Sequence, residues 1–315
     1  MPISFWIVFN AVILILVFID LAADHGDGGV LRFKRALLNS AIWIALALLF
    51  AAVIYRWMGA GKSLEFLSGY LIEEALSIDN LFVFILLFEY FKVSPELERI
   101  VLVWGILGAL VMRAAFIFTG VAVVSRFHWL LYPLGLFLIY TGFRLMLKSS
   151  LEAVDPSRNI IVRFVRKFLP VTDAYQGARF FTIQNGRRFA TPLLIVLLVV
   201  ETTDILFATD SIPAILAITR DSFIVYTSNV FAILGLRSLF FVLASLMKLF
   251  HRLNYGLAIV LMFIGAKMLV AIKYELPTWI VLVVIALVLA ASVAASVIFP
   301  ENEKAASDTD QQPVN

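Results

Sequence analysis

The chain consists of nine long runs of apolar residues separated by short polar segments. The runs lie at about 3–22, 36–57, 68–91, 99–123, 128–148, 191–218, 223–248, 254–272 and 278–299. Each is about 20 residues or longer, which is the length an α-helix needs to cross the hydrocarbon core of a bilayer. Transmembrane strands would give weaker, alternating segments of about 10 residues. The pattern predicts an all-α polytopic membrane protein with about nine transmembrane helices.

Composition agrees with a chain that is almost entirely membrane-embedded. Of 315 residues, 62% are hydrophobic and 15% are charged, and the mean hydropathy is +0.99. Soluble domains are roughly 45–50% apolar and about 25% charged. We therefore expect one transmembrane domain at 1–300, a retained first helix because no basic segment precedes it, and a disordered polar tail at 301–315.

Lys and Arg residues in the predicted loops indicate the orientation. With the N-terminus outside, sixteen of them lie on the cytoplasmic side, in segments 23–35, 92–99, 148–190, 248–253 and the tail. The opposite segments, 56–67, 124–127, 219–222 and 273–277, carry five. The positive-inside rule therefore predicts an N-terminus outside and a cytoplasmic C-terminus.

The longest connection, 149–190, is predicted to be a basic cytoplasmic loop. Apolar residues at helical spacing between 160 and 168 indicate an interfacial helix. Two short apolar runs flank Asn185-Gly186, which predicts a β-hairpin with a type I′ turn. The basic residues match an ordinary positive-inside loop better than a site for anionic lipid or RNA, so we expect no nucleic-acid partner.

An internal repeat relates runs three to five (about 68–148) to runs six to eight (about 191–272). EEALSIDN at 73–80 matches DILFATDS at 204–211, since both place an acid six positions before an Asp. Farther on, GALVMR at 108–113 matches AILGLR at 232–237, and TGFRLM at 141–146 matches IGAKML at 264–269. Because each unit has three helices, which is an odd number, the second unit would cross the membrane in the opposite orientation to the first. Such inverted repeats are typical of secondary transporters with a substrate site near the bilayer midplane.

Six acids lie in the third and sixth runs: Glu73, Glu74, Asp79, Glu201, Asp204 and Asp210. An acid at the centre of a membrane helix costs on the order of 3 kcal/mol, so acids there face one another, a cation or water. Acids this close cannot all be ionised without a cation, and binding one would release protons. Coupling to the proton gradient is a hypothesis that follows.

On a regular helix Asp210 points well away from Asp204. Pro213 lacks an N–H and clashes with the carbonyl of Thr209, so we predict a helix break near 209–213 that turns Asp210 towards Asp204. Broken helices are where transporters coordinate cations.

The residue types around the acids are hard oxygen donors. Supporting hydroxyls and amides are Ser77, Asn80, Thr203 and Ser211. They suit Mn²⁺, Mg²⁺ or Ca²⁺, whereas Cu(I) would favour Cys or Met and Zn²⁺ would favour Cys or His. The chain has no Cys, and its three His lie near the ends of runs. We expect a transported cation and no permanently bound cofactor.

Two arginines, Arg113 and Arg237, lie deep in the fourth and seventh runs. They fit two roles equally well: structural charge balance for the acids, or gating. The acids could also be simple ion-pair partners that hold helices together. Asp20 lies near the end of the first run. It fits a solvated loop end better than a point where a cation enters or leaves the site.

The two acidic motifs, EEALSIDNLFVF at 73–84 and ETTDILFATDSIPA at 201–214, resemble the TerC family, in particular its Alx-like branch. Segments 168–192 and 226–237 are similar to that branch too, and the resemblance runs from the first run to the ninth. It implies a bacterial inner-membrane protein of the LysE-type transporter superfamily, linked to manganese export. By the same resemblance, the acids tied to activity are Glu73, Asp79, Glu201, Asp204 and Asp210.

Two other functions remain to be weighed against a Mn²⁺ exporter. An intramembrane aspartyl protease would need only two aspartates, in a Gly-x-Gly-Asp context that neither Asp79 nor Asp210 has. We therefore expect no enzyme. A non-transporting scaffold for stress or metal resistance would use loop 149–190 for docking but leaves the buried acids unexplained. The sequence does not reveal the oligomeric state.

Overall fold

The computed structural model describes the backbone of residues 3–23, 29–147, 170–172, 174–184, 187–246, 253–270 and 276–298. Within these ranges the nine predicted runs are nine α-helices. Their bounds are α1 Ile3–Ala23, α2 Gly29–Met58, α3 Ala60–Tyr90, α4 Pro95–Arg126, α5 Leu131–Leu147, α7 Pro192–Leu216, α8 Ser222–Leu246, α9 Leu253–Val270 and α10 Thr278–Ile298. A short 3₁₀ turn, η1 His128–Leu130, precedes α5. The all-α fold class is confirmed.

Six of these helices, α1, α2, α4, α7, α8 and α10, are long and apolar enough to cross a membrane. Helix α3 is long as well, but its acids and Lys62 interrupt the apolar run. Helix α4 begins at Pro95, where a missing N–H costs nothing, with Glu96 and Glu98 in its first turn to complement the helix dipole. Helices α2 to α4 therefore extend past their apolar runs into polar residues.

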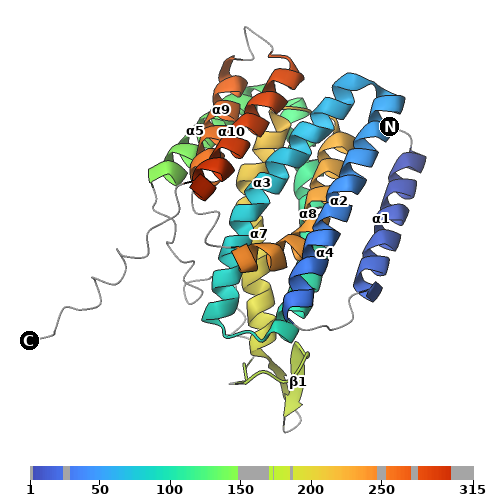
Figure 1. Ribbon diagram of the computed structural model, residues 1–315, viewed down its shortest axis with the longest axis vertical. Helices are drawn as coiled ribbons and strands as arrows, with labels where there is room; N and C mark the ends of the chain where they lie inside the picture. The colour runs from blue at the N-terminus through green and yellow to red at the C-terminus, as the bar shows by residue number, and fades with distance from the viewer. Residues whose placement is uncertain are drawn as a thin grey trace, which may run out of the picture.

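The helices alternate in direction between two ends of the bundle (Figure 1). We call them the N-terminal end, where α1 begins, and the hairpin end, where the strands project. Helix α3 is central and contacts α2, α7, α8 and α10. Helices α5, α9 and α10 form a group on one side, and α1 lies at the opposite edge. The largest buried apolar cluster joins α3, α4, α7 and α8 near the hairpin end.

Close glycine contacts join α5 to α9. A Cβ added at Gly142 would lie 2.6 Å from the carbonyl oxygen of Ala258, and one at Gly265 would lie 2.5 Å from the carbonyl oxygen of Gly135. Only glycine permits such an approach of two backbones. In the repeat alignment Gly142 corresponds to Gly265 and Gly135 to Ala258, so each contact is the repeat image of the other.

The hairpin end carries strands β1 Phe181–Gln184 and β2 Arg187–Ala190, which pair in antiparallel fashion with Gln184 opposite Arg187. The turn at Asn185-Gly186 lies outside the described residues, as do the predicted interfacial helix and the tail at 301–315. Tyr175 donates a hydrogen bond to the carbonyl oxygen of Phe91, 2.8 Å away, and so ties the segment before β1 to the end of α3.

The predicted break in the sixth run is wrong. Helix α7 continues through Pro213 to Leu216. The proline lies in the last turn, where Ala217 still donates to the carbonyl oxygen of Pro213 at 3.0 Å and closes the helix. Because so little helix follows, the hydrogen bond that Pro213 cannot make is lost without breaking the helix, and Asp210 stays turned away from Asp204.

Candidate functional site

A buried guanidinium lies at the centre of the acidic cluster. Arg113 of α4, 2% exposed, binds Asp204 of α7 through two hydrogen bonds, from Nε to Oδ2 at 3.2 Å and from Nη2 to Oδ1 at 2.9 Å. Its Nη1 forms an ion pair with Glu73 of α3 and donates to Oδ1 of Asn229 of α8 at 3.1 Å. One cation therefore links four helices and faces two buried carboxylates.

Burial gives this ion cluster a high energetic weight. Glu73 is fully buried and Asp204 is 5% exposed. A buried charge is tolerated only with partners of opposite sign, and removing one partner of such a pair typically costs about 3–5 kcal/mol. A single guanidinium opposite two carboxylates leaves the cluster with a formal excess of negative charge, which a cation of higher charge would neutralise.

Glu201 lies one turn before Asp204 on α7 and packs over Gly108 of α4, where any side chain larger than hydrogen would overlap its carboxylate. Both acids line a cavity of about 20 Å³ with Gly105 and apolar residues of α3, α4 and α8. That volume holds about one water molecule. Gly108 therefore makes room for a carboxylate beside the ion cluster.

Asp210 lies apart from these acids. Its Oδ1 accepts a hydrogen bond from the Thr141 hydroxyl of α5 at 3.3 Å. The side chain of Asp79 lies outside the described part of the structure. Among the described residues, no three acidic or His side chains gather closely enough to hold a metal ion. The structure thus brings Glu73 and Asp204 to Arg113 and places Glu201 beside Asp204 in one cavity, and the full five-acid ligand set stays a prediction.

The predicted supporting residues are buried. Ser77, Asn80, Thr203 and Ser211 are at most 3% exposed. The Thr203 hydroxyl donates to the carbonyl oxygen of Val199 at 2.7 Å within α7. By contrast, the hydroxyls of Ser77 and Ser211 and one carboxylate oxygen of Glu74 have no hydrogen-bond partner among the described residues. Buried oxygens without partners are unusual, and they are chemically able to bind a cation or water.

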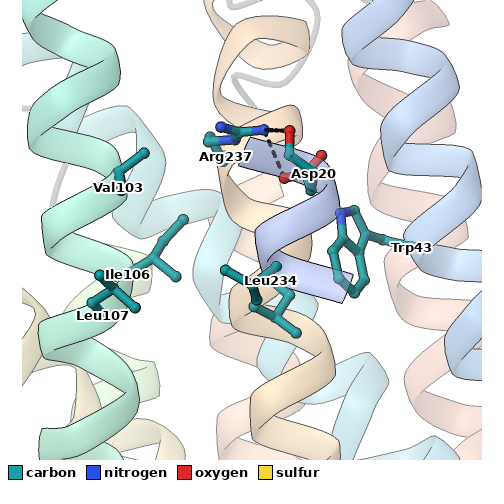
Figure 2. Close-up of a pocket in the computed structure, with 8 residues that line it drawn as sticks. Asp20, Trp43, Val103, Ile106, Leu107, Leu234 and Arg237 are labelled. Carbon is teal, nitrogen blue, oxygen red and sulfur yellow. Dashed lines mark hydrogen bonds and ion pairs between the residues drawn. The ribbon is translucent and has the colours of Figure 1, made fainter. Parts of the chain in front are cut away.

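Arg237, the repeat counterpart of Arg113, has a different partner. Its Nη2 donates to Oδ2 of Asp20 at 2.6 Å and to the backbone oxygen of Asp20 at 3.2 Å. Figure 2 shows this pair between α8 and the end of α1, beside a small cavity that Trp43 of α2 also lines. The prediction that Asp20 is a solvated loop end is therefore wrong, because Asp20 lies within α1, is 17% exposed and pairs with Arg237.

Two further interactions were missed from the sequence. Asn229 lies in the segment 226–237 that resembles the family, but the sequence did not predict its hydrogen bond from Arg113. An amide side chain within an apolar run is the signal that could have indicated this contact. At the N-terminal end, Lys62 binds Glu65 at 2.7 Å and lies 3.7 Å from Asp221. The Thr219 hydroxyl donates to the same Glu65 oxygen at 2.5 Å. This network joins the start of α3 to the α7–α8 loop.

Comparisons with known proteins agree with this architecture. The family described as "Integral membrane protein TerC family" matches residues 58–304. A Myxococcus xanthus protein named "Uncharacterized membrane protein STKORF319" is 47% identical over 293 residues, 93% of this chain and 92% of its own length. The Escherichia coli K12 protein named "Putative membrane-bound redox modulator Alx" is 44% identical over 281 residues, 86% and 87% of the two chains. No solved structure matches.

Proposed function

Since the chain belongs to the TerC family of integral membrane proteins, we propose that it carries a hard divalent cation, in first place Mn²⁺, out of the cell across a bacterial inner membrane. The carrier is not an enzyme and holds no permanent cofactor; the cation is its cargo. The N-terminus faces outside and the C-terminus the cytoplasm, in accordance with the distribution of Lys and Arg. Family membership supports the membrane location, and the site chemistry supports the cargo.

The observation that carries the proposal is the buried pair of Glu73 and Asp204 on one guanidinium. Carboxylates from two helices at the middle of the bundle are the oxygen ligands that Mn²⁺, Mg²⁺ and Ca²⁺ prefer. Arg113 occupies the position between them that a divalent cation would take. Binding of cargo therefore requires Arg113 to move, and its return would expel the cargo.

The symmetric packing of α5 on α9 supports an inverted repeat in this protein. Two antiparallel helices that contact each other at repeat-equivalent glycines are what a two-fold axis in the membrane plane would produce. Such an axis would put the site between α3 and α7 near the midplane. It also permits alternating access by exchange of the two repeats' conformations.

The name of the E. coli relative suggests a redox role for that protein. The 315 residues of this chain contain no Cys, so thiol–disulfide exchange has no residue to act through in them. The divalent-cation carrier therefore remains the function that these residues support best.

The test measures cellular metals by mass spectrometry in cells that lack their own manganese exporters and are loaded with MnCl₂. The wild type should lower cellular manganese, whereas Asp204→Asn and Asp210→Asn, checked for membrane expression, should not. The exposed acid Glu89, at the hairpin end of α3, provides the matched control: Glu89→Gln should export normally. A well-expressed wild type that changes no divalent metal would contradict the carrier and favour a scaffold.

A further inference from the structure

A cavity of about 300 Å³ lies at the hairpin end of the bundle, between α2, α3, α4 and α8. The residues that line it include Phe33, Ile85, Glu98, Phe240, Ala244 and Ser245. At about 30 Å³ for each water, a space of this size holds roughly ten water molecules. It is therefore large enough for a divalent cation together with its first shell of about six waters.

This outer cavity is in line with the inner cavity of about 20 Å³ that Asp204 and Glu201 line. On each of three helices, a residue of the outer cavity lies four positions from one of the inner cavity: Ile85 and Leu81 on α3, Glu98 and Leu102 on α4, and Phe240 and Leu236 on α8. Residues four positions apart lie on the same face of a helix, about one turn from each other. The outer cavity therefore lies one turn closer to the hairpin end, along the same helix faces.

An apolar layer separates the two cavities. Phe240 is 2% exposed, and its ring packs edge-on against Phe88 of α3 with centroids 5.4 Å apart. Both rings belong to the buried apolar cluster that also contains Leu81 and Leu236. An ion cannot enter such a layer without losing its hydration. In this structure the layer keeps the acids apart from the outer cavity, and because it is about one turn thick, the movement of a few side chains would open it.

The repeat counterparts of the outer cavity's lining are packed together at the N-terminal end. In the repeat alignment Ile85 corresponds to Leu216 of α7, and Ala244 corresponds to Gly120 of α4. Leu216 is 4% exposed and belongs to a buried apolar cluster of α4, α7 and α8. A Cβ added at Gly120 would lie 3.4 Å from its side chain. Equivalent residues thus line a cavity at the hairpin end and are in contact at the N-terminal end.

We propose that the outer cavity is the entrance through which a hydrated divalent cation approaches Asp204 and Glu201, and that the ring of Phe240 closes the passage. The cation enters the outer cavity with its waters and loses most of them at the apolar layer, because the inner cavity holds about one water. The packed N-terminal end stays closed during this step, as alternating access requires. The inference rests on the proposed carrier function and adds to it the route of entry and the residue that closes it.

Thiol labelling of the full-length protein in membrane vesicles tests this route, because the chain has no Cys and one introduced thiol reports on one position. Ser245→Cys places the thiol in the outer cavity, and Ala109→Cys places it in the inner cavity. A small cationic methanethiosulfonate reagent is added from the side on which Ile183→Cys of the hairpin is labelled. Ala109→Cys should react about tenfold or more slowly than Ser245→Cys, because the reagent must wait for a minor state in which the layer is open.

Removing the ring of Phe240 should open the passage. Phe240→Ala should raise the labelling rate of Ala109→Cys about tenfold, towards that of a state that is always open; Phe240→Leu, a milder change, should raise it less. Phe116→Ala is the matched control, because it makes the same substitution at the repeat-equivalent position, where the ring is 40% exposed. It should leave the rate unchanged. Ala214→Cys, fully buried near the N-terminal end of α7, reports general loosening and should stay unlabelled in both backgrounds.

Three results would overturn the entrance. One is an unchanged rate at Ala109→Cys when Phe240 is replaced, and another is an equal rise with Phe116→Ala or at Ala214→Cys. The third is labelling of Ala109→Cys only from the side opposite to the hairpin. Labelling does not require transport, so the two proposals fail separately. Absence of Mn²⁺ export by the wild type would overturn the carrier function, and the labelling rates would still decide whether Phe240 closes a route to the acids.

Discussion

At the residue scale, Arg113 decides how the acids of α3 and α7 are arranged. Its planar, always charged guanidinium binds one carboxylate with two hydrogen bonds and still reaches a second acid and an amide. Lysine offers a point charge on a flexible stem and cannot reproduce that geometry. The residue type at 113 is therefore as important as its charge.

Replacing Arg113 should destabilise the protein strongly. Arg113→Met leaves Glu73 and Asp204 buried without a cation and should cost about 3–5 kcal/mol, while Arg113→Lys should cost less. Thermal unfolding of the purified protein in detergent measures both. Arg126→Met, at the exposed end of the same helix, should change little.

The same variant probes the cargo. On the proposed function a divalent cation takes the place of the guanidinium, so MnCl₂ should raise the melting temperature of Arg113→Met more than that of the wild type. Equal shifts for the two proteins would show that Mn²⁺ does not bind between these carboxylates.

At the scale of helices, α7 tolerates Pro213 because the proline lies one turn before the helix end. Proline is about 3 kcal/mol less favourable than alanine in a helix interior. Pro213→Ala should therefore leave Mn²⁺ export intact and raise the melting temperature. A loss of export in this variant would mean that transport requires a break in α7 that this conformation lacks.

The α5–α9 crossing depends on its glycines. Gly142→Ala and Gly265→Ala each place a methyl group against a backbone carbonyl that cannot yield, and should destabilise by about 1–3 kcal/mol. Gly61→Ala in α3 is the matched control, because nothing lies within 4 Å of its added Cβ. Thermal unfolding of the three variants makes the comparison; equal stability of all three would contradict close backbone packing at this crossing.

At the scale of the whole molecule, the two ends should lie on opposite sides of the membrane. Ile183→Cys on β1 and Arg220→Cys in the α7–α8 loop are both exposed. An impermeant maleimide should label Ile183→Cys only in inside-out vesicles and Arg220→Cys only in intact cells. The reverse pattern would invert the orientation expected from the Lys and Arg distribution.

The helices and the approach of Glu73 to Asp204 could be predicted from the sequence, but the partners that these acids bind could not. Glu73 and Asp204 were expected near each other because their motifs repeat. Their common partner Arg113 lies 91 residues before Asp204, so no local pattern could assign it. Asp20 was expected in solvent because it ends an apolar run, and only the packing of α1 on α8 places it against Arg237.

The sequence alone determined the nine apolar runs that form helices, the all-α class and the six acids in the third and sixth runs, because bilayer thickness and the cost of a buried charge act on local stretches of chain. Only the tertiary structure decided that one guanidinium binds Glu73 and Asp204, that Asp210 meets Thr141, and that Pro213 leaves α7 unbroken. Those outcomes depend on which helix faces pack together, and that is settled by side chains far apart in the sequence.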